Sequence, residues 1–251
     1  MPDRLALDGK TAFVTGGSAG LGAHFAQVLA GAGAKVIIAG RRSEPLQALA
    51  ASIEAAGGRC DAVTLDVTCV ESIAGVAPLL EQIDILVNNA GIVREAPLLD
   101  QTDDDWEAVV GTNARGTFAM TRAAARAMRS RGAGGSIINI ASILGLRQGG
   151  GVASYAVSKA AVIQLTKVAA LELARFGIRV NALAPGYCET DLNAGFWDGT
   201  AGRAMIQRIP QRRLGRLQDL DGPLLLLASD ASAYMTGSVI VVDGGHMVST
   251  L

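Results

Sequence analysis

Short apolar runs alternate with longer stretches of helical periodicity along the whole chain. The runs are rich in Val and Ile, and most show no alternation with polar residues; they are 12–15, 35–39, 61–66, 83–88, 136–141, 178–184 and 238–242. Such runs are typical of strands that are buried on both faces of a parallel sheet. The stretches with helical periodicity are 20–32, 43–57, 103–130, 153–176 and 220–229. This alternation predicts an α/β fold, a Rossmann-type doubly wound parallel sheet of about seven strands with helices on both faces.

No linker rich in Pro and Ser and no internal repeat divides the chain. We therefore expect residues 1–251 to form a single domain. The one long stretch without a predicted strand is 185–220. Long strandless segments inside compact domains are often functional. The residues from about 187 to 216 are therefore predicted to form a lid over a substrate site.

Composition and charge exclude several classes of protein. Apolar residues make up 50% of the chain, and 22 Lys and Arg balance 23 Asp and Glu, which excludes a disordered chain. The balanced charge argues against a nucleic-acid or membrane-surface binder. No apolar run reaches the roughly 18 residues that cross a bilayer. Three scattered cysteines and two histidines form neither a disulfide framework nor a metal site. The expected location is the cytoplasm, without nucleic-acid, membrane or metal partners.

Glycine is unusually common, with 31 residues, against a usual share of roughly 7%. Several lie directly after the first predicted strand, in the sequence Thr15-Gly16-Gly17-Ser18-Ala19-Gly20-Leu21-Gly22. A strand, a glycine turn and a helix N-terminus together bind a dinucleotide pyrophosphate well. Gly16 would permit the turn, Gly20 would let the backbone approach phosphate, and Gly22 would let the helix pack closely. The alternative is a tight turn that holds no ligand.

Four further motifs follow in order. They are Asn88-Asn89-Ala90-Gly91, Asn113 within GTNARG, Ser142 with Tyr155-x-x-x-Lys159, and Pro185-Gly186-x-x-x-Thr190. With the glycine loop they span nearly the whole chain, and together they resemble the short-chain dehydrogenase/reductase family. The stretch between Asp66 and Asp84 is a few residues shorter than is usual in that family. We expect a shortened helix there, away from the chemistry.

The end of the second strand, Ala39-Gly40-Arg41-Arg42, bears on the choice of cofactor. An NAD-specific fold carries an acidic residue near this point, whereas a guanidinium can bind a 2′-phosphate bidentately. The sequence thus predicts NADP(H), with NAD(H) less favoured, and Arg41 as the main contact with Arg42 second. The alternative is that these arginines are ordinary surface charge. No basic residue lies inside the glycine loop, where Ser18 and Ala19 stand.

The resemblance implies further cofactor contacts. The glycine loop would contribute Ser18 and Leu21, and Asp66 and Val67 would flank the adenine. Asn89, Ala90 and Gly91 would line the cofactor, and Pro185, Gly186, Cys188 and Thr190 would surround the nicotinamide carboxamide. Other roles are open for some of them: Asp66 as a helix N-cap near Thr68, Asn88 as strand support, and Cys188 as a substrate contact or a small filler.

Tyr155 and Lys159 lie four residues apart in a well-patterned helix, and this spacing places them on one face. A nearby ammonium group would favour the phenolate and lower the pKa of Tyr155 from about 10. Tyr155 is thus the candidate acid for ketone reduction and the candidate base for alcohol oxidation. Ser142 would hydrogen-bond the substrate oxygen. By the resemblance, Lys159 would also hold the nicotinamide ribose, and Asn113 would anchor a water in a proton path.

Candidate substrate contacts lie in the predicted lid and between Ser142 and Tyr155. They are Leu144, Gln148, Tyr187, Leu192, Phe196 and Trp197. We expect a largely apolar pocket, which suits a ketone or a 3-oxoacyl substrate better than a free sugar; the alternative is that these residues pack the lid onto the body. The region is also locally basic, through Arg203, Arg208, Arg212, Arg213 and Arg216. These arginines could receive an anionic substrate tail, although a solvated face is favoured.

The leading hypothesis is an NADP(H)-dependent carbonyl reductase or alcohol dehydrogenase that acts on a small molecule. The alternatives are an NAD-dependent sugar or polyol dehydrogenase on the same fold, and a protein that senses NADP(H) without turnover. The intact set of Asn113, Ser142, Tyr155 and Lys159 argues against the sensor. The C-terminal segment 238–251, which begins with the final strand, resembles a subunit contact of the family, which implies a homotetramer.

Overall fold

The computed structural model describes residues 4–189 and 197–249. Thr190, Leu192 and Phe196, three of the predicted site residues, lie outside these ranges. Within them seven strands form one parallel sheet in the order β3-β2-β1-β4-β5-β6-β7. The strands are β1 (Thr11–Thr15), β2 (Lys35–Gly40), β3 (Arg59–Thr64), β4 (Ile85–Asn88), β5 (Gly135–Ile140), β6 (Ile178–Pro185) and β7 (Val239–Val242). The predicted doubly wound sheet is confirmed.

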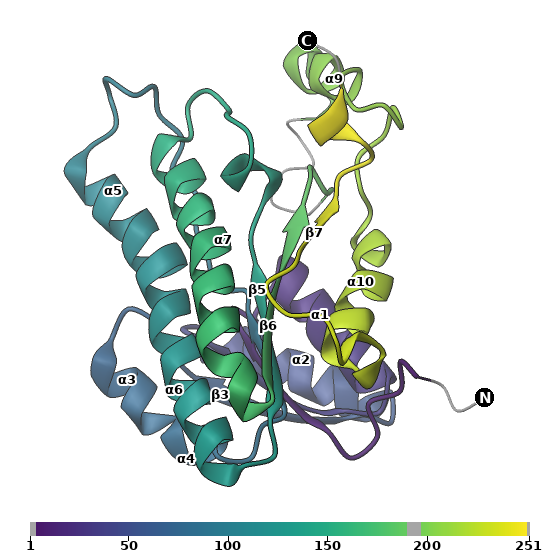
Figure 1. The fold of residues 1–251 in the computed structure, drawn as a ribbon. Coiled ribbons are helices and arrows are strands. Elements are labelled where there is room, and N and C mark those ends of the chain that lie inside the picture. The colour runs from purple at the N-terminus through teal and green to yellow at the C-terminus, as the bar shows by residue number, and fades with distance from the viewer. Residues whose placement is uncertain (1–3, 190–196, 250–251) are drawn as a thin grey trace.

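Helices cover both faces of the sheet (Figure 1). One layer contains α1 (Gly20–Gly31), α2 (Ser43–Ala55) and α10 (Asp221–Ala228). The other contains α3 (Val70–Gly75), α4 (Ala77–Leu80), α5 (Asp103–Val110), α6 (Thr117–Arg131) and α7 (Ala153–Leu173). Near the chain's C-terminal end, α9 (Thr200–Ile206) lies beyond the sheet in Figure 1. No helix among the described residues is long and apolar enough to cross a membrane.

The alternation of side chains along each strand divides the core between the two faces. On β1 and β2, Val14 and Ile38 pack with α1, α2 and α10, whereas Phe13 and Ile37 belong to the cluster on the opposite face. All four side chains are at most 2% exposed. Apolar residues on both sides of a strand explain why these runs carry no polar alternation. The edge strand β3 differs, because most of its residues are exposed or half-buried.

One of the predicted helical stretches differs in detail from its pattern. The stretch 103–130 is not one continuous helix, because a π-helical turn, Gly111–Gly116, separates α5 from α6. Such turns are frequent at functional sites, and this one carries Asn113. Between Asp66 and Asp84 the structure has only the short helices α3 and α4. The expected shortening is confirmed.

The strand order reverses beside β1, which lies between β2 and β4. The connections leave the two halves of the sheet in opposite directions at this point, so a crevice forms outside the carboxyl ends of the strands. The segments that follow β1 to β6 carry many of the predicted site residues, and helix α7 carries Tyr155 and Lys159. The fold therefore gathers segments that are far apart in the sequence at one edge of the sheet.

Candidate functional site

A cleft of about 2250 Å³ lies at the carboxyl ends of the strands. Most of the predicted residues line it: Gly16, Ser18, Gly20, Leu21, Arg41, Arg42, Asp66, Val67, Asn89, Ala90, Gly91, Ser142, Leu144, Gln148, Tyr155, Lys159, Pro185, Gly186, Tyr187, Cys188 and Trp197. Gly22 and Asn113 stand behind the wall rather than in it. One continuous cleft thus holds both the predicted dinucleotide residues and the predicted catalytic residues.

The glycine loop has the geometry that its sequence predicts. Gly16 and Gly20 have positive φ angles of 66° and 55°, which side chains rarely permit. A Cβ atom on Gly22 would lie 2.2 Å from the carbonyl oxygen of Gly16 and 2.4 Å from Nδ2 of Asn89. Helix α1 therefore packs against the loop so closely that only glycine fits at Gly22. This cradle of backbone at a helix N-terminus suits a pyrophosphate.

Thr15 holds the loop to the next strand, a role that the sequence analysis missed. Its hydroxyl accepts hydrogen bonds from the backbone N–H groups of Asn89 and Ala90, each at 3.0 Å, and it donates to the carbonyl of Val87 at 3.3 Å. The side-chain Nδ2 of Asn89 in turn donates hydrogen bonds to the carbonyls of Thr15 and Gly16. The signal was present, because Thr15 immediately precedes the glycine turn.

Asn88 is buried and serves the sheet rather than the cleft. Its Nδ2 donates to Oδ1 of Asn139 and to the hydroxyl of Thr121, each at 2.9 Å. Asn139 in turn donates to the hydroxyl of Thr166 at 2.9 Å. This chain of polar groups joins β4 and β5 to helices α6 and α7. Strand support, one of the two roles considered for Asn88, is the role that the structure shows.

Two arginines and one carboxylate lie at the end of the cleft where the sequence predicts the adenine part of the cofactor. Arg41 and Arg42 are exposed, and Arg42 donates to the hydroxyl of Ser18 at 3.1 Å, which brings the end of β2 to the glycine loop. Asp66 does not cap the following helix, contrary to one interpretation of the sequence. The helix begins at Val70 with Cys69 as its N-cap. The Asp66 carboxylate instead accepts from the backbone N–H and the hydroxyl of Thr68.

The hydrogen bonds from Thr68 are the main reason that the pKa of Asp66 is lowered, and the positive charge of Arg41 lowers it further. Asp66 is therefore a carboxylate at neutral pH and stands within electrostatic reach of Arg41. The end of β2 and the end of β3 thus form one polar rim. The guanidinium of Arg41, unlike that of Arg42, makes no hydrogen bond within the described residues.

The predicted catalytic residues meet where β5 ends beside α7. Ser142 follows β5, is 7% exposed, and its hydroxyl accepts a hydrogen bond from the backbone N–H of Leu144 at 3.1 Å. Burial raises the pKa of Tyr155, a hydrogen bond with Ser142 lowers it, and Tyr187 raises it. The predicted lowering of this pKa is therefore wrong for the chain by itself. Tyr155 is a neutral phenol at neutral pH, the form that can donate a proton.

Lys159 lies one helical turn beyond Tyr155, as the spacing predicts. Its Nζ is 5.6 Å from the centre of the Tyr155 ring and donates to the carbonyl of Ile140 at 2.7 Å. Burial lowers the pKa of Lys159 to about 8. With this pKa, Lys159 loses its proton before the Tyr155 phenol titrates, so its charge does not offset the effect of burial on the pKa of Tyr155.

Asn113 connects three elements behind these residues. Its Oδ1 accepts from the N–H of Ile92 at 2.8 Å, and its Nδ2 donates to the carbonyl of Ile92 at 2.9 Å and to the hydroxyl of Ser158 at 3.0 Å. The π-helical turn, the loop after β4 and helix α7 are thus joined through one side chain. The structure supports a positioning role for Asn113, while its predicted role in a proton path stays a prediction.

The segment after β6 forms the next part of the wall. Gly186 is packed so closely that a Cβ atom would lie 2.8 Å from Cα of Asp243. Cys188 is 8% exposed and pairs with Gly215 in an isolated bridge. Burial raises the pKa of Cys188 to about 11, and Asp219 adds to the effect. Cys188 is therefore a protonated thiol that packs partly into the core.

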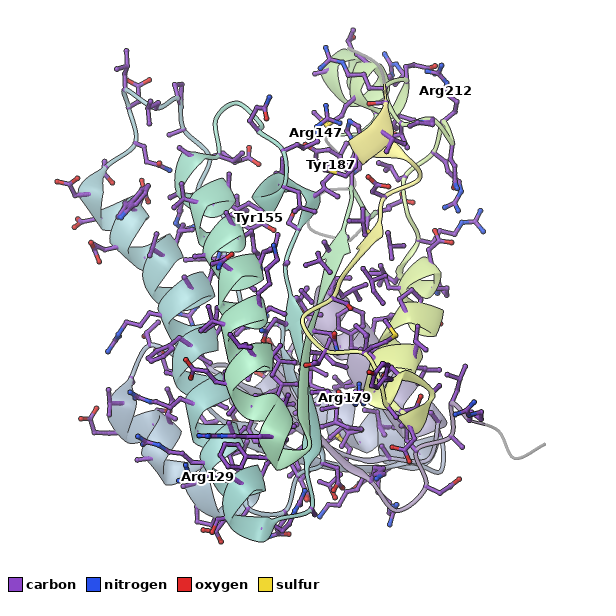
Figure 2. All side chains as sticks on the ribbon, viewed as in Figure 1. Arg129, Arg147, Tyr155, Arg179, Tyr187 and Arg212 are labelled. Atoms are coloured by element: carbon purple, nitrogen blue, oxygen red, sulfur yellow. The ribbon has the colours of Figure 1, made fainter. Side chains whose placement is uncertain are left out.

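The outer part of the cleft carries more charge than the sequence analysis expected. Apolar Leu144 and Trp197 do line it, but so do Arg147, Arg208 and Arg212. Arg147 comes from the loop after Ser142 and donates to the carbonyl of His246. Arg147 and His246 were missed as site residues, and Arg208 and Arg212 were expected on a solvated face. Figure 2 shows Arg147 and Tyr187 close together, with Tyr155 deeper in the fold.

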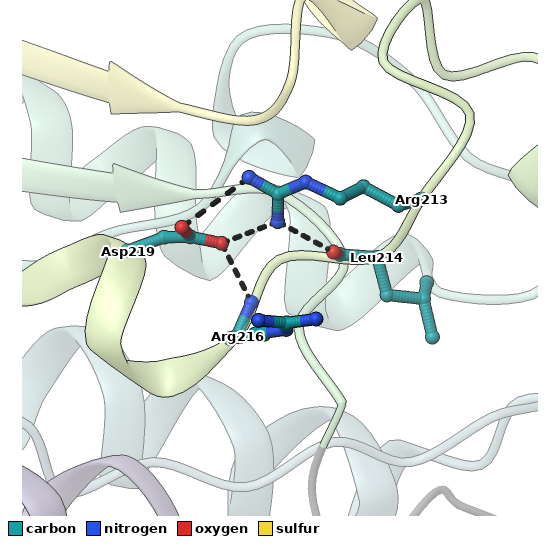
Figure 3. A network of polar contacts seen from close by, with 4 residues as sticks. All are labelled: Arg213, Leu214, Arg216 and Asp219. Carbon is teal, nitrogen blue, oxygen red and sulfur yellow. Dashed lines mark hydrogen bonds and ion pairs between the residues drawn. The ribbon is translucent and has the colours of Figure 1, made fainter.

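Two other arginines of the basic segment have a structural role instead. Arg213 donates to both carboxylate oxygens of Asp219, at 2.5 and 3.3 Å, and to the carbonyl of Leu214 (Figure 3). The backbone N–H of Arg216 donates to the same carboxylate at 2.8 Å. These contacts fix the loop that leads into α10. The basic segment thus contains arginines that line the cleft and arginines that support it.

The comparisons with known proteins agree with this geometry. A family model described as enoyl-(acyl carrier protein) reductase matches residues 16–247. The chain is 39% identical over 246 residues to a 3-oxoacyl-(acyl-carrier-protein) reductase of Thermotoga maritima, and the match covers 96% of this chain and 99% of the relative. This chain belongs to the short-chain dehydrogenase/reductase family. The resemblance that the sequence motifs suggested is confirmed.

Other members of the family are dehydrogenases of sugar acids. A 2-dehydro-3-deoxy-D-gluconate 5-dehydrogenase of Bacillus subtilis is 42% identical over 249 residues, with 98% of this chain and 97% of the relative covered. A crystal structure of a gluconate 5-dehydrogenase from Burkholderia cenocepacia, in complex with NADP and tartrate, superposes with a TM-score of 0.94 at 40% identity and covers 99% of each chain. The family's members therefore include enzymes with different carbonyl and alcohol substrates.

No group of three or more His, Cys, Asp or Glu side chains among the described residues is placed to hold a metal ion. His24, which lies on α1 away from the cleft, pairs with Asp221 at 2.6 Å.

Proposed function

We propose that this protein is an oxidoreductase that transfers a hydride between NADP(H) and a carbonyl or secondary alcohol substrate. The observation that carries the proposal is that one cleft is lined by both the predicted catalytic residues and the predicted dinucleotide-binding residues. Ser142, Tyr155 and Lys159 lie together at one end, and the glycine loop with Arg41 and Arg42 lies at the other. This arrangement suits a dinucleotide whose phosphates bind at a helix N-terminus and whose reactive ring lies beside an acid.

The residues of the cleft fit the cofactor at three points. The backbone cradle of Gly16, Gly20 and Gly22 would hold the pyrophosphate. Arg41 is exposed beside the end of β2, where a 2′-phosphate is expected, and its guanidinium is available for a bidentate contact. NADP in the relative from Burkholderia cenocepacia supports the same cofactor here. A preference for NADPH over NADH follows from the two arginines and from the absence of an acidic residue at Gly40.

A bound nicotinamide would supply or accept the hydride. In the direction of reduction, the neutral Tyr155 hydroxyl would donate a proton to the substrate oxygen as negative charge develops there. The Ser142 hydroxyl would stabilise that charge. Lys159, held by the carbonyl of Ile140, would contact the ribose and would favour the phenolate once the proton has left. In the direction of oxidation, Tyr155 would accept the proton instead.

We also propose a substrate lid, self-association of the chain and a location for the protein. Tyr187 and Trp197 pack edge to face, with ring centroids 5.6 Å apart, which supports a substrate wall or lid over about 187–216. Exposed apolar side chains on α5, α6 and α7, including Trp106 at 38%, Phe118 at 45% and Leu171 at 82%, support self-association into a homotetramer. The cytoplasm remains the expected location.

The test is a panel of ketones, oxo acids and keto sugars assayed with NADPH and with NADH, and of the matching alcohols with the oxidised cofactors. We expect reduction of at least one carbonyl compound, with a higher kcat/KM for NADPH than for NADH. A protein that binds NADPH tightly but reduces no member of the panel would be a sensor rather than an enzyme. Tighter binding and faster turnover with NADH would contradict the assignment of Arg41.

A further inference from the structure

Three arginines at the outer end of the cleft lack carboxylate partners. Arg147, Arg208 and Arg212 all line the cleft, and none forms a salt bridge with a residue that the structure describes. Arg212 reaches only the amide oxygen of Gln207, at 3.5 Å, and the guanidinium of Arg208 makes no hydrogen bond to any described residue. Arg213 on the same loop, by contrast, is neutralised by Asp219. Unpaired guanidinium groups in a concave site are suited to an anion.

The end of the cleft that carries these three arginines, here called the positive end, lies next to Tyr155. Tyr187 is near enough to Tyr155 to raise its pKa, and the ring of Tyr187 is 5.7 Å from that of His246. Burial raises the pKa of Tyr187, and the charge of Arg147 partly offsets this effect. Burial lowers the pKa of His246, and the charges of Arg147 and Arg208 lower it further. A molecule whose carbonyl touches Tyr155 can therefore extend past Tyr187 toward Arg147 and Arg208. Figure 2 shows Tyr187 and Arg147 side by side, with Arg212 farther out.

The other charged groups leave this end positive. Glu95 lines the same part of the cleft and is near enough to raise the pKa of Tyr187. Burial and the two arginines lower the pKa of His246, while Asp243 raises it; His246 is therefore neutral at neutral pH. Among the described residues that line this part of the cleft, Arg147, Arg208 and Arg212 thus face one carboxylate, Glu95, while Asp243 acts on His246 without lining the cleft. The presence of Glu95 disfavours a dianionic phosphate more than a singly charged carboxylate.

The backbone conformation of Arg212 also indicates a ligand site at the outer end of the cleft. Arg212 is the only residue other than glycine with a positive φ in the described chain, at 56°. A long side chain seldom adopts this conformation, and residues held in it cluster at ligand sites. The turn is fixed on both sides, because the N–H of Arg212 donates to the carbonyl of Ile209 at 2.8 Å and that of Gln211 donates to Gly244. The fold therefore maintains an unfavourable conformation that directs a cation at the cleft.

We infer that the substrate carries a carboxylate on the same molecule as the reacting carbonyl or hydroxyl, and that Arg147 and Arg208 bind this carboxylate, with Arg212 adding positive charge farther out on the same wall. The substrate class is a short oxo acid and its hydroxy acid product. This inference rests on the proposed function, because it assigns the substrate of the same cleft. It replaces the expectation of a ketone in a largely apolar pocket.

The test compares each acid with its neutral amide. The full chain is assayed with NADPH and 4-oxopentanoate, 5-oxohexanoate, their two primary amides, dihydroxyacetone phosphate and the neutral diketone 2,3-butanedione. We expect kcat/KM for the better acid to exceed that for its amide by at least tenfold. In Arg208→Met and in Arg147→Met this ratio should fall about tenfold, through a higher KM for the acid and with an unchanged KM for the amide. Arg126→Met, which removes an exposed charge from α6, is the matched control and should leave the ratio unchanged.

Each other outcome overturns a defined part of the account. Equal kcat/KM for acid and amide, or an acid preference that survives in Arg208→Met and Arg147→Met, would overturn the carboxylate site. Faster reduction of dihydroxyacetone phosphate would replace carboxylate by phosphate. Reduction of 2,3-butanedione alone would overturn this inference and leave the proposed function intact. No oxidation of NADPH with any of the six compounds, or with the wider panel, would overturn both.

Discussion

The ammonium group of Lys159 donates a hydrogen bond of 2.7 Å to the backbone carbonyl of Ile140. This contact ties the helix that carries Tyr155 to the end of the strand that leads to Ser142. The two side chains that we propose as catalytic, Ser142 and Tyr155, therefore keep their relative position through a lysine that is itself only 5% exposed. The contact also holds a titratable group in an environment that disfavours its charge.

Lys159 should make the stability of the unliganded protein depend on pH. Its pKa is about 8 in the folded chain and about 10.5 in an unfolded one, so the unfolded state binds the extra proton between these values. The contribution of Lys159 to the free energy of unfolding should therefore rise with pH from about 8 to about 10.5, by up to about 3 kcal/mol. Denaturant unfolding of the wild type and of Lys159→Met over this range measures the difference. A difference that is constant with pH would contradict the burial of the charge.

Gly22 should tolerate no side chain. A Cβ atom would meet the Gly16 carbonyl oxygen at 2.2 Å, and this oxygen belongs to backbone that has little freedom to move. Gly22→Ala should destabilise the fold by at least about 2 kcal/mol and weaken NADPH binding. Gly31→Ala, in the same helix with nothing within 4 Å, is the control and should be neutral or stabilising by about 0.5–1 kcal/mol. Similar unfolding curves for the two variants would contradict the close packing of α1 on the loop.

Arg41 should distinguish the two nicotinamide cofactors. A hydrogen bond to a charged group contributes about 1.5–3 kcal/mol, so Arg41→Ala should weaken NADPH binding about ten- to a hundredfold and leave NADH binding unchanged. Arg42→Ala should have a smaller effect on NADPH, because Arg42 also bonds to Ser18. Fluorescence titration with both cofactors measures these values. Equal losses for NADPH and NADH would assign Arg41 to the fold rather than to the 2′-phosphate.

The three cysteines should differ in reactivity. Burial raises the pKa of both Cys60 and Cys188 to about 11, whereas Cys69 is half-buried at the start of α3. Since the thiolate is the reactive form, Cys69 should be alkylated by iodoacetamide at pH 8 long before the other two. Mass spectrometry of peptides from the native and the unfolded protein identifies the order. Early labelling of Cys188 would show that its thiol is accessible and activated in the cleft.

Most of the framework could be predicted from the sequence, because the signals for it are local. Buried parallel strands appear as unbroken apolar runs, and the glycines from Gly16 to Gly22 mark a tight turn between a strand and a helix. The Tyr155 and Lys159 pair follows from helical spacing alone. Each of these features depends on residues that are neighbours along the chain.

The sequence-based predictions that proved wrong or incomplete depend on contacts between distant segments of the chain. The pKa of Tyr155 is raised mainly by its burial in the folded chain, which a spacing of four residues does not reveal. Arg147 and His246 are 99 residues apart in sequence and meet only in the folded chain. Arg208 and Arg213 lie in the same basic stretch of the sequence. Only Arg213 forms a salt bridge, with the carboxylate of Asp219, six residues later in the chain. Pairing of this kind decides which arginines remain available for a substrate.

The most direct test of the central claim is Tyr155→Phe, measured for both cofactor binding and turnover. The account predicts NADPH binding within about twofold of the wild type and a loss in kcat of at least about a hundredfold for the best carbonyl substrate, because the proton donor is gone. Retained turnover with intact cofactor binding would contradict the assignment of Tyr155 as the acid, and with it the proposed reaction at this cleft.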